Sequence, residues 1–326
     1  EVLPQAVLYL RVYFLGSLAV ILYNVCMGIL QAVGDSRHPL YYLIFSSIVN
    51  IILDLVFCGA FRLGVEYAAL ATVISQMLSV VLCMIRLIRT QDVYQVSIRE
   101  IRFDWPLLKQ IIHQGLPSGM QNSIISIANM VVQSNINSFG KMAMAGCGAY
   151  SKIEGFGFLP ITCFAMAMTT FIGQNLGARE FDRVKKGARF GILCGVGLAE
   201  AVGIGINLFI PQLIALFDRT PEVIQFGVTQ AKIVTLFYFL LSFSHVIAGI
   251  MRGAGKSMVP MLVMLISWCL IRITYVTITI HFIPDIRVVF WAYPMTWTIS
   301  SIIFLIYYKK ADWIHYFDRQ EEKQCA

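Results

Sequence analysis

Apolar positions dominate this chain in long runs, and short polar connections separate them. A helix that crosses the hydrocarbon core of a bilayer needs about 20 predominantly apolar residues, and runs of that length recur from end to end. Gly, Pro and charged residues fill the connections, as is typical of helix ends. The pattern predicts nine helices, over residues 6–33, 40–61, 66–89, 107–139, 142–175, 184–217, 222–252, 257–283 and 287–309.

The composition places this pattern in a membrane. Of the 326 residues, 58% are hydrophobic and 13% are charged, whereas a soluble domain is about 45–50% apolar and about 25% charged. The apolar runs are too long for the strands of a barrel. The eight cysteines lie mostly inside apolar runs and never form a CxxC pair, so neither a disulfide framework nor a metal site is expected. The sequence therefore predicts an all-α polytopic membrane protein.

The formal net charge of +7 does not indicate nucleic acid, because the basic residues lie in short loops between spans. Alternate loops differ strongly in basic content. The loops on one side hold most of the Lys and Arg, and those on the other side hold only Arg62, Lys141, Arg219 and Arg287. The positive-inside rule then predicts that the carboxyl terminus is cytoplasmic in a multi-pass protein of the cytoplasmic membrane.

The chain also repeats itself. "GILQAVGDSRHP" at 28–39 returns as "GIMRGAGKSMVP" at 249–260, and each copy ends one span and precedes the next. Six predicted spans separate the copies, so both have the same orientation, as in a 6+6 parallel repeat. The second copy has about 115 more residues before it within its repeat than the first copy has. We therefore expect three further helices upstream of residue 1.

This arithmetic gives a domain plan. Residues 1–89 are expected to be the remnant of an amino-terminal lobe, 90–106 a cytoplasmic linker, 107–310 a six-helix carboxyl-terminal lobe, and 311–326 a cytoplasmic tail.

Several stretches together resemble a known family. "GILQAVGDSRHPL", "NIILDLVF", "GLPSGMQNS", "AYSKIEGFGFLPI" and "IAGIMRGAGKSMVP" resemble the multidrug and toxin extrusion (MATE) transporters, and within them the DNA-damage-inducible (DinF-like) bacterial branch. The resemblance covers nearly the whole chain. It implies twelve helices in two lobes around a V-shaped cavity. It also implies a monomer in the lipid bilayer that exports small organic molecules, cations among them, by antiport against Na⁺ or H⁺, with no other cofactor.

The segment "NIILD" holds the leading candidate site. Asn50 and Asp54 are four residues apart in an apolar run, so they share one helix face. A charged residue in a span costs about 2.5–3.5 kcal/mol on insertion scales and usually marks an ion path. Thr72 lies at a matching depth on the next span. A carboxylate, an amide and a hydroxyl suit either Na⁺ or a proton, and the alternative is a structural acid that hydrogen-bonds a neighbouring helix. The resemblance implies a cation and proton site at Asn24, Asn50, Asp54 and Thr72.

A second polar cluster falls in the other predicted lobe. Lys152, Glu154, Glu200 and Arg272 lie within spans, and their charges sum to zero. Mutual pairing would neutralise them, either as a structural lock or as a cavity wall that contacts substrate. Gln121 is neutral and lies on the span where the resemblance implies an acid in sodium-coupled relatives, so we expect it to line the cavity rather than to bind the cation.

A flippase and an intramembrane enzyme are the two alternatives to an efflux antiporter. A lipid-linked saccharide flippase of the same superfamily is the alternative to an efflux antiporter. It should have a more cationic cavity, yet apart from Arg287 and the basic residues at their cytoplasmic ends the spans hold only Arg11, Lys152, Lys232 and Arg272. An intramembrane enzyme needs a catalytic constellation such as HExxH or paired acids on one helix face. The five histidines are scattered, so no enzyme is predicted.

Overall fold

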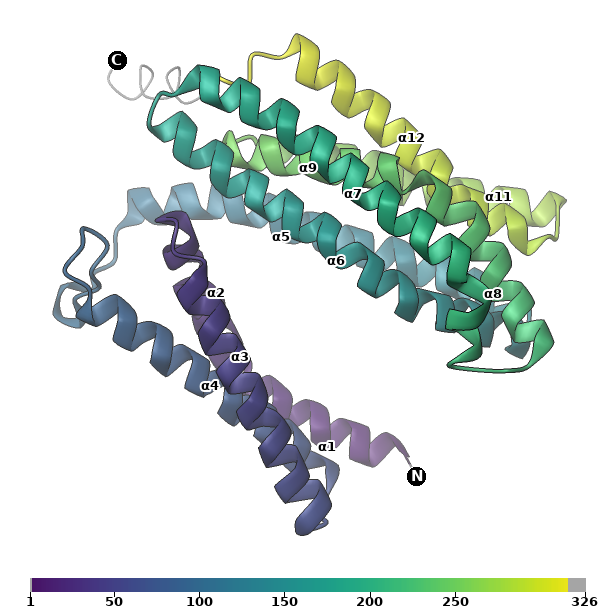
Figure 1. Ribbon diagram of the computed structural model, residues 1–326, viewed down its shortest axis with the longest axis horizontal. Helices are drawn as coiled ribbons and strands as arrows, with labels where there is room; N and C mark the ends of the chain where they lie inside the picture. The colour runs from purple at the N-terminus through teal and green to yellow at the C-terminus, as the bar shows by residue number, and fades with distance from the viewer. Residues whose placement is uncertain (1, 316–326) are drawn as a thin grey trace. The chain divides into compact units, whose positions relative to one another are not determined.

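The computed structural model describes residues 2–315, and its regular elements are helices joined by turns. The chain divides into two compact units, Glu1–Phe103 and Asp104–Ala326 (Figure 1). Every predicted span falls on a helix or on a set of consecutive helices. Most of the predicted tail, residues 316–326, lies outside the described residues.

Unit 1 contains α1 to α4. Its elements are α1 (Val2–Leu15), α2 (Ser17–Ala32), α3 (Arg37–Asp54), the π-helical turn η1 (Leu55–Ala60), α4 (Val65–Arg89) and the short 3₁₀ helix η2 (Ile98–Glu100). The predicted span 6–33 is bent by 43° between α1 and α2. Helix α4 packs against α1, α2 and α3, so it is the central helix of the unit.

The interior of unit 1 is small. Tyr23, Cys26 and Leu30 of α2 pack with Val80, Cys83 and Leu87 of α4. The outer surface is apolar as well, and Ile44, Ile48 and Ile52 of α3 are all about half exposed. A soluble domain seldom leaves such a row of large aliphatic side chains uncovered. The exposed row is therefore suited to the acyl chains of a bilayer.

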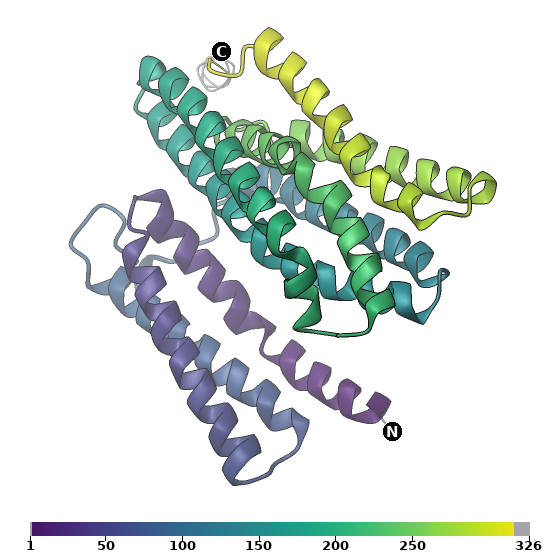
Figure 2. The same ribbon diagram turned by 45° about the vertical axis from the view of Figure 1, so that its right-hand side comes forward.

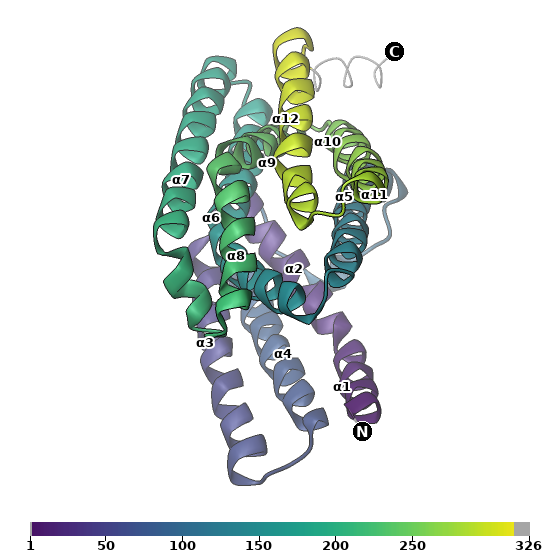
Figure 3. The ribbon, with the colours of Figure 1, turned by 90° about the vertical axis from the view of Figure 1, so that its right-hand side faces the viewer.

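Unit 2 is larger and holds the remaining helices (Figures 2 and 3). They are α5 (Trp105–Asn137), α6 (Lys141–Gly177), α7 (Phe181–Ala215), α8 (Pro221–Val234), the 3₁₀ turn η3 (Thr235–Phe237), α9 (Tyr238–Gly253), α10 (Met258–Met264), the π-helical η4 (Leu265–Ile271), α11 (Arg272–Phe282) and α12 (Ile286–Lys310). Helices α6, α7 and α9 pack against one another, and α5 lies beside α10 and α11.

Fewer helices than the nine predicted pass a test of length and hydropathy for crossing a membrane. In the part of the chain that the structure describes, seven helices are long and apolar enough to cross a membrane, or eight if the bent pair α1–α2 is one span. Helix α5 is 33 residues long but does not pass this test. It carries polar residues throughout its length, including Gln121, Asn122 and Asn129. The all-helical membrane architecture is confirmed, and the count of nine spans stays a prediction.

The repeated sequence motif forms the same turn twice. Gly34 has φ +89° and Gly255 has φ +74°, which is the left-handed region that glycine adopts at helix ends. After each glycine, the next amide reaches back to the helix: Asp35 N–H donates to Leu30 and Lys256 N–H to Met251, both at 2.8 Å. Helices α3 and α10 then begin at equivalent positions of the repeat. The two turns therefore share one local geometry.

Candidate functional site

The face of α3 that carries Asn50 and Asp54 is half-buried in unit 1. One atom of each side chain is fully enclosed, namely Asn50 Nδ2 and Asp54 Oδ1. Within the described part of the chain, neither atom has a hydrogen-bond partner. A buried polar atom without a partner costs roughly 1–3 kcal/mol, and more when it is charged. The carboxylate oxygen of Asp54 is an acceptor that a proton or a cation can satisfy, whereas the Nδ2 group of Asn50 can only donate.

Helix α4 supplies two more polar groups. Thr72 is half-buried, and its hydroxyl donates to the carbonyl of Ala68 at 3.1 Å, which leaves the oxygen lone pairs free to accept. One turn further along, Gln76 has a buried Oε1 atom with no hydrogen-bond partner among the described residues. Gln76 was not among the predicted site residues. The signal was present, since Gln76 follows Thr72 at the same spacing that joins Asn50 to Asp54.

A hydrogen bond fixes how these two helices face each other. The hydroxyl of Ser79 on α4 donates to that of Ser46 on α3, and both residues are buried. Helices α3 and α4 follow each other through a short connection at 61–64 and run in opposite directions. Each turn forward along α3 from Ser46 therefore matches a turn backward along α4 from Ser79. This register places Asn50 near the level of Gln76, and Asp54 near the level of Thr72.

Asn24 stands apart from this arrangement. It lies on α2 and is exposed, and its amide nitrogen donates to the carbonyl of Val20 in its own helix at 2.8 Å. No group of three or more His, Cys, Asp or Glu side chains suited to a metal occurs among the described residues. The donors along α3 and α4 are one carboxylate with amide and hydroxyl oxygens, which fits a hard monovalent cation or a proton rather than a transition metal.

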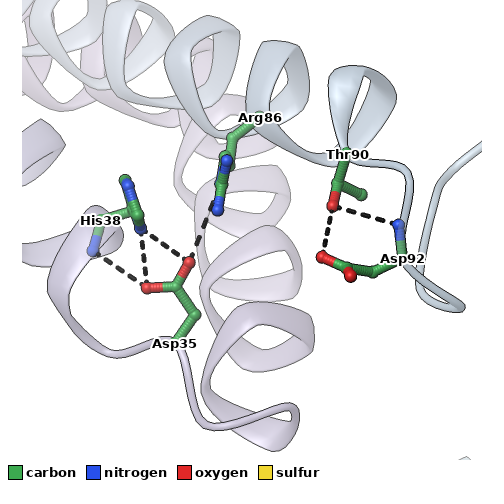
Figure 4. A network of polar contacts seen from close by, with 5 residues as sticks. All are labelled: Asp35, His38, Arg86, Thr90 and Asp92. Atoms are coloured by element: carbon green, nitrogen blue, oxygen red, sulfur yellow. Dashed lines mark hydrogen bonds and ion pairs between the residues drawn. The ribbon is translucent and has the colours of Figure 1, made fainter.

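A charged network lies at the opposite end of unit 1, where α3 begins and α4 ends (Figure 4). The Nδ1 atom of His38 lies 2.7 Å from one carboxylate oxygen of Asp35, and the Nε atom of Arg86 lies 3.8 Å from the same oxygen. Burial raises the pKa of Asp35, but hydrogen bonds from the side chain and backbone of His38 outweigh it, so the pKa lies below its usual value. The network ties the turn before α3 to the end of α4.

The neighbouring contact in Figure 4 fixes the start of the linker after α4. The Thr90 hydroxyl donates to Asp92 Oδ2 at 2.7 Å, and the Asp92 amide donates back to the Thr90 oxygen at 3.4 Å. The hydroxyl hydrogen bond lowers the pKa of Asp92, which is exposed. These contacts shape a turn and show no feature of a binding site.

In unit 2, Arg272 is the most deeply buried charge. It is 1% exposed and lies directly after the π-helical segment η4. Its guanidinium donates to Thr296 Oγ1 at 3.0 and 3.3 Å and to Asn129 Oδ1 at 3.2 Å. The rings of Trp268 and Tyr293 lie 5.0 and 4.7 Å from its carbon Cζ, within the range of cation–π attraction.

Glu154 is the acidic residue that interacts electrostatically with Arg272. The two groups influence each other electrostatically without forming an ion pair. The Glu154 carboxylate accepts a long hydrogen bond from the hydroxyl of Tyr150 at 3.5 Å, and that hydroxyl lies 3.2 Å from the hydroxyl of Tyr238. Arg272 and Glu154 are therefore within electrostatic range of each other, but each has its own set of hydrogen-bond partners.

The other two charges of the predicted cluster have different contacts. Lys152 is exposed, and its Nζ atom lies 5.3 Å from the ring of Phe217. Glu200 accepts a hydrogen bond from the backbone N–H of Phe239 at 3.2 Å, just after the 3₁₀ turn η3. The structure therefore joins only Glu154 and Arg272 of the four charges electrostatically.

Gln121 lies against the second copy of the repeated turn. It is 2% exposed, and its Oε1 atom accepts a hydrogen bond from Arg252 at 3.3 Å. One face of α5 reinforces this contact, because Gln114 donates to the carbonyl of Gly255 at 2.6 Å and accepts from the hydroxyl of Ser257. Gln121 thus binds a helix end through its side chain.

His245 is a further buried polar residue that was not among the predicted site residues. It lies on α9 between the rings of Phe158 and Trp268, at 5.1 and 5.5 Å between ring centres, and both contacts are edge-to-face. Its Nε2 atom is buried without a hydrogen-bond partner in the described residues. A lone histidine in an apolar span gives no sequence signal that separates packing from function, and the aromatic enclosure favours packing.

A family model described as MatE matches residues 1–56 and 117–278 of the chain. These segments include the Asn50–Asp54 face, the turn at 249–257 and most of the helices of unit 2. The chain belongs to the MatE family. MatE proteins are membrane transporters, so the prediction that the chain is not an enzyme holds at the level of the family.

Curated relatives of this MatE chain are bacterial transporters. It is 28% identical over 313 residues to the probable multidrug resistance protein YpnP of Bacillus subtilis, which covers 96% of the chain and 70% of YpnP. It is 28% identical over 272 residues to the probable multidrug resistance protein NorM of Thermotoga maritima, which covers 82% of the chain and 58% of NorM. It is 27% identical over 224 residues to an FAD transporter of Shewanella oneidensis, which covers 67% of the chain and 49% of that transporter.

Solved structures support the fold. A crystal structure of MATE in complex with MaL6 superposes with a TM-score of 0.87 at 23% identity, over 94% of this MatE chain and 70% of that chain. A crystal structure of MATE in the bent conformation gives a TM-score of 0.85 at 24% identity, over 93% of this chain and 67% of that chain. The chain thus spans between about half and 70% of the length of these relatives and structures.

Proposed function

We propose that this protein works in a secondary efflux antiporter that exports small organic molecules in exchange for H⁺ or Na⁺, and that Asp54 is the coupling carboxylate. One observation carries the proposal: the buried Oδ1 atom of Asp54 has no hydrogen-bond partner among the described residues, and its neighbours from Ile51 to Phe57 are otherwise apolar. The names of the relatives, YpnP and NorM among them, support multidrug efflux. They do not favour the flippase alternative.

The geometry suggests how Asp54 performs the exchange. When ionised, a half-buried carboxylate without a donor is unfavourable in a span. A proton on Oδ1, or a sodium ion shared with the oxygens of Thr72 and Gln76, removes that cost. The buried Nδ2 group of Asn50, one turn away, has no acceptor among the described residues, so it can donate a hydrogen bond to the carboxylate after the cation leaves. The four side chains therefore offer both a loaded and an unloaded arrangement.

The substrate is proposed no more narrowly than a small organic molecule, cations among them. The relatives are named for drug resistance and, in one case, for FAD transport. Glu154 is half-buried on α6, within electrostatic range of the buried Arg272. We propose that Glu154 is the acidic group of a substrate-contacting wall in unit 2, while Arg272 orients it.

The test is cation-driven transport in proteoliposomes that carry the protein. Asp54→Asn keeps the shape of the side chain and removes its charge, so exchange driven by a proton or sodium gradient should fall to background. Asn50→Ala should weaken the exchange less. Asp92→Asn makes the same chemical change at an exposed linker position, and it should leave transport unchanged. Well-inserted Asp54→Asn protein that exports at the parental rate across the pH range would show that Asp54 is only structural.

We also propose that the chain follows the 6+6 parallel-repeat plan of its family, works as a monomer and has a cytoplasmic carboxyl terminus. The matching turns at Gly34 and Gly255 support the repeat, and the distribution of basic residues supports the orientation. A single cysteine at Ser97, in a background without the native cysteines, should be protected from an impermeant thiol reagent outside intact cells. Labelling there from outside would reverse the orientation.

A further inference from the structure

An open groove of about 490 Å³ lies at the end of α6 and α7 where the two helices join. Its rim is charged and its floor is apolar. Glu180, Asp182, Arg183 and Lys186 form the rim, and Phe171, Gly187 and Phe190 line the rest. Because α6 and α7 are both candidate membrane spans, their shared end lies at a membrane surface. The groove therefore stands at the level where lipid headgroups meet acyl chains.

The helical spacing explains this gradient. Lys186 and Gly187 lie three and four residues after Arg183, and Phe190 lies four and three residues after them, so the four residues occupy one face of α7. At 1.5 Å per residue, the face descends about 12 Å from Asp182 to Phe190. Phe171 of α6 covers Gly187 so closely that a Cβ atom at Gly187 would lie 2.1 Å from the phenylalanine ring. The groove thus changes from charged to aromatic as it enters the span.

The rim charges have no ionic partner among the side chains that the structure describes. Across the described residues, none of the four charged side chains of the rim forms an ion pair or a side-chain hydrogen bond. Two acids and two bases give the rim no net charge. Such a rim does not select an anion by charge alone, but it offers acceptors for an ammonium group beside donors for a phosphate.

We propose that this groove binds a zwitterionic phospholipid with a primary ammonium group, namely phosphatidylethanolamine. Arg183 and Lys186 bind the phosphate, Glu180 and Asp182 accept N–H donors from the ammonium group, and Phe171 and Phe190 contact the acyl chains. Phosphatidylcholine has the same net charge but no N–H donor, because its nitrogen carries methyl groups. Phosphatidylglycerol has the phosphate but no ammonium group. The proposal rests on the membrane location of the chain and not on its transport activity.

The experiment measures lipid binding to the detergent-purified protein by native mass spectrometry. The probes are phosphatidylethanolamine, phosphatidylcholine and phosphatidylglycerol with identical acyl chains. The parent should bind phosphatidylethanolamine about ten-fold more tightly than either other lipid, the difference expected for a lost set of charge-assisted hydrogen bonds. Equal or tighter binding of phosphatidylglycerol to the parent would overturn the proposal in favour of simple anion capture.

Matched variants locate the site. Arg183→Gln with Lys186→Gln should lower the affinity for phosphatidylethanolamine about ten-fold. Glu180→Gln with Asp182→Asn should abolish its preference over phosphatidylglycerol. Lys185→Gln is the control, because Lys185 is exposed beside the groove without lining it. An equal loss in Lys185→Gln would refute the site. Displacement of the lipid by glycerophosphoethanolamine at the same concentration would overturn the proposal that the groove binds a whole phospholipid, since Phe171 and Phe190 would then add nothing to the affinity.

Discussion

Ser79 on α4 donates its hydroxyl hydrogen bond to Ser46 on α3, and this buried contact sets the register of the two helices that carry the candidate coupling site. Asp54 lies two turns along α3 from Ser46, and Thr72 lies two turns along α4 from Ser79. A polar pair between two otherwise apolar helices has few alternative partners in a membrane. The bond therefore selects the one sliding position at which Asp54 and Thr72 reach the same level.

Removing this bond should loosen unit 1 measurably. Ser46→Ala and Ser79→Ala should each lower the thermal midpoint in detergent. A double-mutant cycle should give an interaction energy of about 0.6 kcal/mol, the average for interhelical hydrogen bonds in membranes. Ser47→Ala is a matched control. Ser47 is exposed and donates to the Leu43 carbonyl of its own helix at 2.8 Å, so its replacement should leave the midpoint nearly unchanged. Strictly additive effects of the two buried serines would contradict the proposed register bond.

The Asp35 network predicts a pH dependence of stability. The folded protein holds the pKa of Asp35 below its usual value, so the folded state binds the proton less tightly than the unfolded state. The stabilisation is therefore complete above the ordinary aspartate pKa of about 3.9 and is lost as the pH falls through the lower, folded value. Partly exposed pairs of this kind contribute about 0.2–1 kcal/mol.

The measurement is the thermal midpoint of the parent and of Asp35→Asn from pH 7 down to the acid limit of the detergent-solubilised protein. The parent should be the more stable of the two at neutral pH, and the difference should shrink in acid. A difference that is constant or grows as the pH falls would mean that His38 and Arg86 do not stabilise the charged form of Asp35.

Much of this fold follows from the sequence, for a simple reason. In a bilayer, the length of an apolar run and the glycine or proline that ends it decide where a helix lies. The bend at Gly16 and the π-helical segments η1 and η4 were not predicted, because they depend on what packs against the helix. The shared face of Asn50 and Asp54 followed from spacing alone.

Tertiary contacts were less accessible to sequence reasoning. The charges of the second cluster predicted mutual pairing, but the partners of Arg272 are Asn129 and Thr296, which are neutral and lie far from it in the chain. Nothing in the spacing of residues 129, 272 and 296 indicates that they meet. Gln76 was missed for a different reason, since a glutamine in a span gives a weaker signal than an acid even at the same helical spacing.

The repeated turn gives a third prediction. Gly34→Ala and Gly255→Ala force a Cβ atom into the left-handed region, which costs roughly 1–2 kcal/mol, so each variant should unfold at a lower temperature. Gly197→Ala is the control, because it lies within α7 with no atom within 4 Å of the added Cβ, and alanine is the better helix former there. Its midpoint should stay the same or rise. A neutral Gly255→Ala would show that this turn adopts another conformation in the membrane.

The last prediction concerns the shape of the buried cation rather than its charge. Arg272→Lys keeps the positive charge of the side chain, but an ammonium group cannot reproduce the planar fork that bonds Thr296 and Asn129 while lying between the Trp268 and Tyr293 rings. The loss of at least two buried hydrogen bonds should cost about 2 kcal/mol of stability. It should also shift the tryptophan emission of the protein, because the guanidinium lies over the ring of Trp268. Arg287→Lys, at the exposed start of α12, should change neither quantity. If Arg272→Lys instead keeps the parental midpoint and emission spectrum, charge alone holds this part of unit 2, and the role of Arg272 in orienting Glu154 fails with it.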